Sequence, residues 1–293
     1  MAGRRSLRRN VFIYDASRPD HEIGGLRLNP SVSKTNFLSM LEILIIADCP
    51  YTVILHGTNE IIEATDEQLQ PGRYYIKPST PQGRIFMTDE PCALRTLSHT
   101  RTGRDEEFGK AVRERDGRCV ITGVINPDAD IDDWPGFEAA HIFPLSKEDN
   151  FIHQGLSRWI TNRTGTRDTG INSCQNGLLM RAQIHQHFDG FRFSINVDDN
   201  YKVDGRTLDP ICRAPNDERS VRDELLRWHF RQAVLANMRR AGEPIFEFDF
   251  PPGTDMVGDI LRGPKSEERM EAELFTRLWP GSRTGGQSCC YFR

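Results

Sequence analysis

Two residues in the second half of the chain have the types and the spacing to bind one divalent cation. His185 and Asp189 lie four residues apart, and residues 182–188 have the pattern of a helix that Gly190 closes. On a helix, residues i and i+4 share a face, so the imidazole and the carboxylate can bind the same ion. His187 points to a different side of such a helix, and we interpret it as a polar surface residue. These ligand types are compatible with magnesium, manganese or zinc, and they predict a single divalent metal ion.

Three further residues could act on a substrate beside such an ion. His141 lies in the strand-like segment 137–143, and a neutral imidazole there could take a proton from an attacking water. Asn176 precedes His185 by nine residues, and its side-chain amide could accept a hydrogen bond from His141 or brace a loop. Arg181 lies one helical turn before His185, on the face of the metal ligands, where its guanidinium could bind a phosphate.

The elements that would position these residues can be predicted from hydrophobic periodicity and from glycine and proline. Residues 105–116 have the charges of a solvated helix that ends at Gly117. The longest predicted helix covers residues 217–240, and a last amphipathic helix is predicted at 267–278. Between them the pattern predicts a short strand and turn at 119–123, a helix within 149–160 that Trp159 anchors, a short strand at 178–180 and a strand at 191–197.

The first third of the chain has a mixed pattern and contains no convincing site. Strands are predicted at residues 11–14, 51–55 and 74–76, and a helix at 35–48 after a cap at Ser33 or Thr35. We therefore divide the chain into four parts: a disordered basic tail (1–9), an N-terminal α+β module (10–98), a central domain (99–205) and a C-terminal helical region (206–293).

Four short motifs in the central domain occur in an order that identifies a family resemblance. They are CVITG at 119–123, EAAHIFPLS at 138–146, NGLLM at 176–180 and IHQHFDG at 184–190. Together they resemble the HNH nuclease domain, in the version common in filamentous-fungal proteins, over about residues 119–197. The resemblance implies an α+β fold with a ββα-metal core, placed between the N-terminal module and the C-terminal helices.

The same resemblance implies roles for the residues that match the motifs. His141 would be the general base that activates water, and Asn176 would orient it. His185 and Asp189 would bind the metal ion. Many HNH enzymes have a third ligand immediately before the base, and this chain has Ala140 there. Because Glu138 shares a strand face with Ala140, we expect Glu138 to replace that ligand, directly or through a water.

Charge weakens the case for a nucleic-acid substrate, and it leaves three functions open. The net charge is −4, and residues 119–205, with seven basic and twelve acidic side chains, carry −5. The leading prediction is a metal-dependent endonuclease that cuts phosphodiester bonds of DNA, with RNA left open as a second substrate. The alternatives are a degenerate HNH scaffold that acts as a binding module, or an HNH-fold enzyme that works on a small fungal metabolite. The candidate phosphate ligands are dispersed: Arg101, Arg104, Lys110, Arg113, Arg115, Arg118, Arg158, Arg163, Arg167 and Arg181.

Composition predicts where the protein works. Of the 293 residues, 37% are hydrophobic, and no run approaches the ~18 apolar residues of a membrane span. The start of the chain lacks the apolar run of a signal peptide. Seven cysteines without a CxxC pair do not form a disulfide framework or a structural zinc site. We expect an intracellular protein of the nucleus or cytoplasm that is neither secreted nor bound to a membrane; the oligomeric state is left open.

Overall fold

The computed structural model describes residues 5–58, 60–93, 103–163, 168–203 and 205–240, together with residues 257 and 270. The chain divides into a compact unit, Met1–Glu243, and a second unit, Pro244–Arg293. The helix predicted at 267–278 lies outside the described residues apart from Met270. The account below therefore concerns the first unit.

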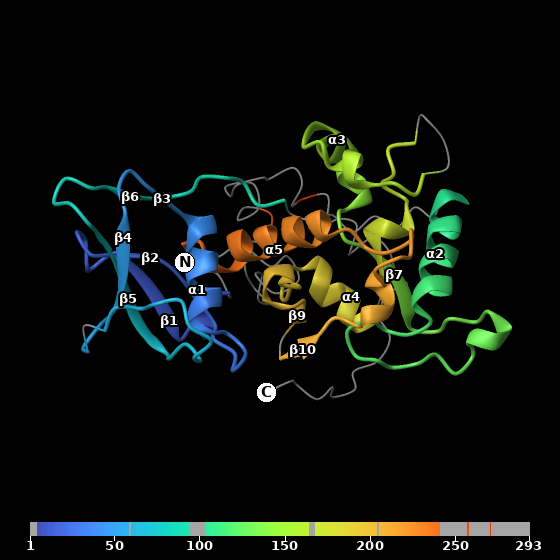
Figure 1. Ribbon diagram of the computed structural model, residues 1–293, viewed down its shortest axis with the longest axis horizontal. Coiled ribbons are helices and arrows are strands. Elements are labelled where there is room, and N and C mark those ends of the chain that lie inside the picture. Colours follow the sequence, from blue (N-terminus) through green and yellow to red (C-terminus); the bar gives the residue numbers. More distant parts are fainter. Residues whose placement is uncertain are drawn as a thin grey trace. The chain divides into compact units, whose positions relative to one another are not determined.

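Helices and strands alternate in this unit, so the α+β fold class is confirmed (Figure 1). The helices are α1 (Lys34–Leu44), α2 (Gly103–Asp116), α3 (Glu148–His153), α4 (Ala182–Asp189) and α5 (Asp223–Met238). The strands are β1 (Val11–Asp15), β2 (Glu22–Leu26), β3 (Ile45–Ala47), β4 (Tyr51–Leu55), β5 (Gly72–Pro78), β6 (Ile85–Met87), β7 (Phe137–His141), β8 (Gly177–Arg181), β9 (Lys202–Val203) and β10 (Arg206–Thr207).

The N-terminal module is a four-stranded sheet with one helix. Its strands lie in the order β2-β1-β5-β4, and β1 is parallel to β5 while the other two pairs are antiparallel. The predicted strands 11–14, 51–55 and 74–76 are thus confirmed. Alternate residues of β1, among them Val11 and Ile13, are fully buried in the core of this module, as the two-residue period of a strand requires.

Helix α1 begins where the sequence predicts it and ends earlier. The Ser33 side chain accepts a hydrogen bond from the backbone N–H of Asn36 at 3.2 Å, which caps the first turn. The prediction that the helix continues to residue 48 is wrong, because residues 45–47 form β3 and pair with β6. The adjacent β-branched residues Ile45 and Ile46 favour a strand at this point.

The central domain is built on a two-stranded hairpin and the helix that follows it. Strands β7 and β8 are antiparallel, with His141 opposite Gly177 and Glu138 opposite Met180. Helix α4 begins directly after β8, and the hairpin lies between α4 and α2 (Figure 1). This arrangement is the ββα unit that the motifs imply, and it separates the hairpin into an α4 side and an α2 side.

Three predicted elements of this domain differ from the structure, two of them only in part. The turn predicted at 119–123 is confirmed, closed by a hydrogen bond from Gly123 N to Cys119 O, but the strand before it is not formed. A helix within 149–160 is confirmed by α3, which ends at His153, but Trp159 is 40% exposed and does not anchor the segment. Residues 191–197 do not form the predicted strand: Phe191 has φ +53°, a left-handed value that breaks an extended strand, and Asn196 makes only an isolated bridge, to Lys202.

Helix α5 belongs to two hydrophobic cores. Its first half, with Leu225, Leu226 and Trp228, packs in the core of the central domain. Its second half, with Val234 and Leu235, packs in the core of the N-terminal module. The prediction places α5 in a separate C-terminal region (206–293), whereas in the structure this helix contributes side chains to the cores of both preceding parts.

Part of the predicted basic tail is built into the folded unit. Of residues 1–9 the structure describes 5–9, which include the short 3₁₀ helix Ser6–Arg8. The Arg9 side chain is buried and pairs with Glu22 at 3.1 Å. Arg9 also donates to the backbone carbonyls of Asn237 and Arg240. Residues 5–9 thus contact both β2 and the end of α5.

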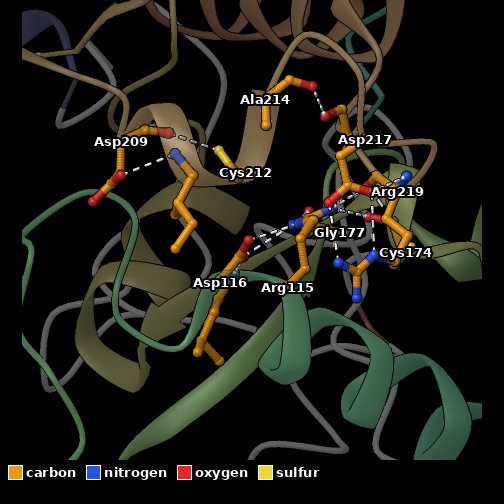
Figure 2. Close-up of polar contacts among 12 residues, drawn as sticks. Arg115, Asp116, Cys174, Gly177, Asp209, Cys212, Ala214, Asp217 and Arg219 are labelled. Carbon is orange, nitrogen blue, oxygen red and sulfur yellow. Dashed lines mark hydrogen bonds and ion pairs between the residues drawn. The ribbon is translucent and has the colours of Figure 1, made fainter.

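A buried ion pair fixes α2 to β8 (Figure 2). Arg115 and Asp116 contact each other through two hydrogen bonds of 2.6 and 2.9 Å, and their side chains are 1% and 0% exposed. The Arg115 guanidinium also donates to the carbonyls of Cys174, Gly177 and Arg219. Asp116 accepts from the backbone N–H of Leu179 at 2.8 Å. Every end of this pair is satisfied, so it joins α2, β8 and the segment before α5.

Two further expectations concern membranes and cysteines. Within the described residues, no helix combines the length and the hydropathy that crossing a membrane needs. The five described cysteines, Cys49, Cys92, Cys119, Cys174 and Cys212, are free thiols, and all but Cys49 are buried.

Candidate metal and catalytic site

Glu138, His185 and Asp189 meet on the α4 side of the hairpin. The His185 ring is held at both nitrogens: Nδ1 lies 2.7 Å from Glu138 Oε2, and Nε2 lies 3.1 Å from Asp189 Oδ2. The strand register places Glu138 beside α4, and the helical spacing places Asp189 one turn after His185. The three side chains therefore form a row, carboxylate–imidazole–carboxylate, with the imidazole 21% exposed.

This row can hold a divalent ion through two of its members. In octahedral coordination, metal–ligand bonds of about 2.1 Å place two neighbouring ligand atoms about 3 Å apart, which matches the distance between His185 Nε2 and Asp189 Oδ2. Glu138 is on the other ring nitrogen, the position where metal-binding histidines commonly donate to a carboxylate. Among the described residues, no three His, Cys, Asp or Glu side chains converge as a complete metal cage. The donor set thus fits an ion with open positions.

The two carboxylates change the acidity of the imidazole between them. Burial lowers the pKa of His185, but the hydrogen bonds with Asp189 and Glu138 outweigh it and raise the pKa from 6.5 to about 9. Because the folded pKa is above the ordinary value, this arrangement stabilises the metal-free protein fully below about pH 6.5. The stabilisation is lost as the pH rises through about 9.

We predict that the metal-free protein shows a His185 titration midpoint near pH 9, and that Glu138→Gln lowers it. The neutral amide removes one of the two negative charges that favour the imidazolium. Nitrogen-15 NMR of the histidine rings measures both midpoints, with Glu114→Gln, an exposed carboxylate on α2, as the matched control. A wild-type midpoint at or below 6.5 contradicts the prediction.

His141 lies on the opposite side of the hairpin, against α2. Its ring stacks on Phe108 with centroids 3.9 Å apart and planes 10° from parallel. A Cβ on its cross-strand partner Gly177 would come within 2.7 Å of Phe108, so only glycine allows α2 to approach this closely. His141 is the last residue of β7, at the edge of the hairpin, so its ring is fixed at the end of the sheet.

A hydrogen bond with Asn172 fixes the orientation of the His141 ring. His141 Nε2 is 3.0 Å from Asn172 Oδ1. A carbonyl oxygen can only accept, so with this amide orientation the imidazole proton is on Nε2 and the basic lone pair is on Nδ1. This is the tautomer in which Nδ1 can accept a proton.

Asn176 contacts the loop backbone in this arrangement. Its side chain is completely buried, accepts from Phe143 N at 2.8 Å and donates to the carbonyls of Phe143 and Ile171. The sequence left two roles open for this amide, a bond to His141 or bracing of a loop, and these contacts are those of the bracing role. Asn176 thus joins the segment that follows His141 to the segment that precedes Asn172.

Several of the predicted phosphate ligands make polar contacts within the protein. Arg115 is buried with Asp116, Arg118 pairs with Asp209, and Arg163 donates to carbonyls of its own loop. The side chains of Arg101, Arg104 and Arg167 lie outside the described residues. Three others of these predicted ligands lie over aromatic rings instead: Arg113 on Trp134, Arg158 on Trp159 and Arg181 on Phe137. Arg181, the N-cap residue of α4, is exposed.

Sequence reasoning missed Asn172 and Phe108. Neither residue belongs to a motif, and both are more than thirty residues away from His141. The asparagine type and its position four residues before Asn176 are the only signals that single out Asn172. His187 is exposed, as predicted for a surface residue.

Two segments of the chain match models of known families. Residues 8–83 match the model of a domain of unknown function (DUF8573). Residues 119–196 match the model of the HNH endonuclease family. No curated protein and no solved structure matches the chain. The match covers β7, β8 and α4 with the residues described above, so the chain contains an HNH endonuclease-type domain.

Proposed function

We propose that the protein is a divalent-metal-dependent endonuclease that hydrolyses phosphodiester bonds of DNA or RNA. The observation that carries the proposal is the His185 imidazole between Asp189 and Glu138 on the helix of a ββα unit. The HNH endonuclease match over 119–196 supports the nuclease class.

His141 is the general base in this proposal. Its ring is on the α2 side of the hairpin and His185 and Asp189 are on the α4 side, so the proposal requires the substrate to reach both around the end of β7, where His141 lies. Asn172 holds the ring through Nε2, so Nδ1 takes the proton of the attacking water. Phe108 holds the ring in one plane. The imidazole is therefore already oriented before the reaction and loses less conformational entropy on reaching the transition state. Asn176 keeps the loop around this ring in place through its three backbone bonds.

His185 and Asp189 hold the metal ion, and Glu138 orients His185 through Nδ1. When bound, a divalent ion supplies positive charge to a phosphodiester oxygen as negative charge develops on it. Glu138 thus compensates for the ligand missing at Ala140 by fixing the ring of a ligand that remains. Arg181, exposed at the start of α4, supplies a guanidinium to a neighbouring phosphate.

Metal affinity separates the roles of the two carboxylates. We expect Glu138→Ala to weaken Mn²⁺ binding about 10–100-fold, the usual cost of removing a residue that orients a metal-bound histidine. Asp189→Ala removes a ligand and should abolish detectable binding. Calorimetric titration of the full chain measures both, with Glu114→Ala as the control. Unchanged affinity in Glu138→Ala rules out the proposed role of Glu138.

Cleavage assays test the substrate class. Supercoiled plasmid, single-stranded DNA and single-stranded RNA are incubated with the protein and Mg²⁺, Mn²⁺ or Zn²⁺ in turn. Nicking that EDTA abolishes supports the proposal, and binding of these polymers without cleavage favours the degenerate-scaffold alternative. For Arg181→Ala we expect weaker nucleic-acid binding, with the slope of affinity against salt reduced by about one.

A further inference from the structure

The end of α4 is contacted by groups from both ends of the folded unit. Helix α4 has eight residues, and Asp189 is its last. A helix this short is marginal by itself, and its last turn frays unless tertiary contacts hold it. The 3.1 Å distance from His185 Nε2 to Asp189 Oδ2 depends on that last turn.

Helix α5 binds the last turn of α4 through His229. This histidine is completely buried, and its Nε2 donates to the carbonyl of Phe188 at 3.1 Å. Its Nδ1 accepts from the Ser194 hydroxyl at 2.7 Å, and its ring stacks on Phe188 with centroids 3.7 Å apart. Both nitrogens are therefore used, and the bond falls on the residue directly before Asp189.

Arg5 and Asn237 bind the two residues that follow Asp189. The Arg5 guanidinium donates to the carbonyl of Gly190 at 2.8 Å and to Asn237 Oδ1 at 2.5 Å. Asn237 donates to the carbonyl of Phe191 at 2.6 Å. A cation at a helix C-terminus also interacts favourably with the helix dipole.

Phe191 shows that the end of α4 is held against backbone strain. Its φ of +53° is a left-handed value that a bulky residue rarely adopts. Its ring is 1% exposed and packs in the core of the N-terminal module, whereas Phe188 packs in the core of the central domain. The chain thus passes from one core to the other within three residues of Asp189.

We propose that Arg5, His229 and Asn237 form a clamp that holds Asp189 in the position required to bind a divalent cation together with His185. The inference rests on the proposed metal site and goes beyond it, because it makes the N-terminal module and α5 structural parts of that site. All three clamp residues are positioning residues: they act on the backbone at 188–191 and through it on Asp189.

Mn²⁺ titration of the full chain, followed by the electron paramagnetic resonance signal of free Mn²⁺, tests the clamp. We expect Arg5→Met to weaken Mn²⁺ binding about tenfold, and Arg5→Lys to restore part of the affinity because it keeps a cation near Gly190. The matched control is Arg8→Met, which changes an exposed arginine in the adjoining 3₁₀ helix and should leave the affinity unchanged. His229→Phe keeps the stacking on Phe188 and removes both hydrogen bonds, so a loss of at least the same size is expected.

Circular dichroism confirms that each variant is folded before its affinity is compared. If His229→Phe does not fold, the arginine series alone decides. Wild-type Mn²⁺ affinity in a folded Arg5→Met protein, or an equal loss in Arg8→Met, overturns the clamp. A wild-type protein that binds no Mn²⁺ overturns both the clamp and the proposed function. A protein that shows the affinity pattern but does not cleave nucleic acid refutes the nuclease and supports the clamp.

Discussion

His141→Ala is expected to lower the rate of nucleic-acid cleavage about 10²–10⁴-fold, the usual contribution of a positioned general base. The variant removes the group that takes the proton from water and leaves the row of Glu138, His185 and Asp189 intact. Mn²⁺ affinity should therefore stay at the wild-type value. Single-turnover cleavage at saturating metal measures the rate, and calorimetry measures the affinity.

The control for this variant is His153→Ala, which removes an exposed histidine from α3. Loss of the stacking on Phe108 should also reduce the free energy of unfolding by about 0.5–1.5 kcal/mol. That loss is measured by urea denaturation and leaves most of the protein folded at 25 °C. Cleavage by His141→Ala at the wild-type rate contradicts the assignment of the base.

Asp116→Ala is expected to reduce the free energy of unfolding by about 3–5 kcal/mol, the largest stability effect that the fold predicts. The substitution leaves the Arg115 guanidinium buried without its carboxylate, and it removes the acceptor of Leu179 N in β8. Because Arg115 also binds the carbonyls of Cys174 and Gly177, the loop that carries Asn172 and Asn176 should loosen with it.

Arg118→Ala provides the comparison for this prediction. Arg118 makes two hydrogen bonds with Asp209, as Arg115 does with Asp116, but the Arg118 side chain is 38% exposed. A pair open to water contributes little, so the loss should be much smaller. Urea denaturation of both variants measures the difference, and equal losses would show that burial is not the cause.

The meeting of Glu138, His185 and Asp189 could be predicted from sequence because their relation is local. His185 and Asp189 are one helical turn apart, and Glu138 follows from the alternation of a strand next to a matching motif. The sequence did not predict which nitrogen of the His185 ring each carboxylate contacts: Glu138 contacts Nδ1, whereas Asp189 contacts Nε2. That difference changes the expected role of Glu138 from a replacement ligand to an orienting carboxylate.

The surroundings of His141 could not be predicted, because they depend on packing between distant segments. Phe108 comes from α2 and Asn172 from the loop before β8. Neither has a periodic or motif signal, and Phe108 reaches the ring only because α2 lies close to Gly177.

Two other differences between the predicted and the observed structure also arise from packing between distant segments. Residues 191–197 alternate as a strand does, but the passage of Phe191 into the core of the N-terminal module imposes a left-handed turn. The basic residues of the predicted tail indicate exposure to water. In the structure, however, Arg5 donates to the carbonyl of Gly190 directly after α4, and Arg9 donates to the carbonyl of Asn237 near the end of α5. Tertiary contacts override local propensity in both places.

Cleavage of supercoiled plasmid before and after metal removal tests the central claim most directly. We predict that the purified chain nicks plasmid with at least one of Mg²⁺, Mn²⁺ and Zn²⁺, that EDTA stops the reaction, and that adding the ion back in excess restores it. Cleavage that continues unchanged in EDTA, or no cleavage with any of the three ions, contradicts the claim that His185 and Asp189 hold a metal ion for His141-dependent hydrolysis.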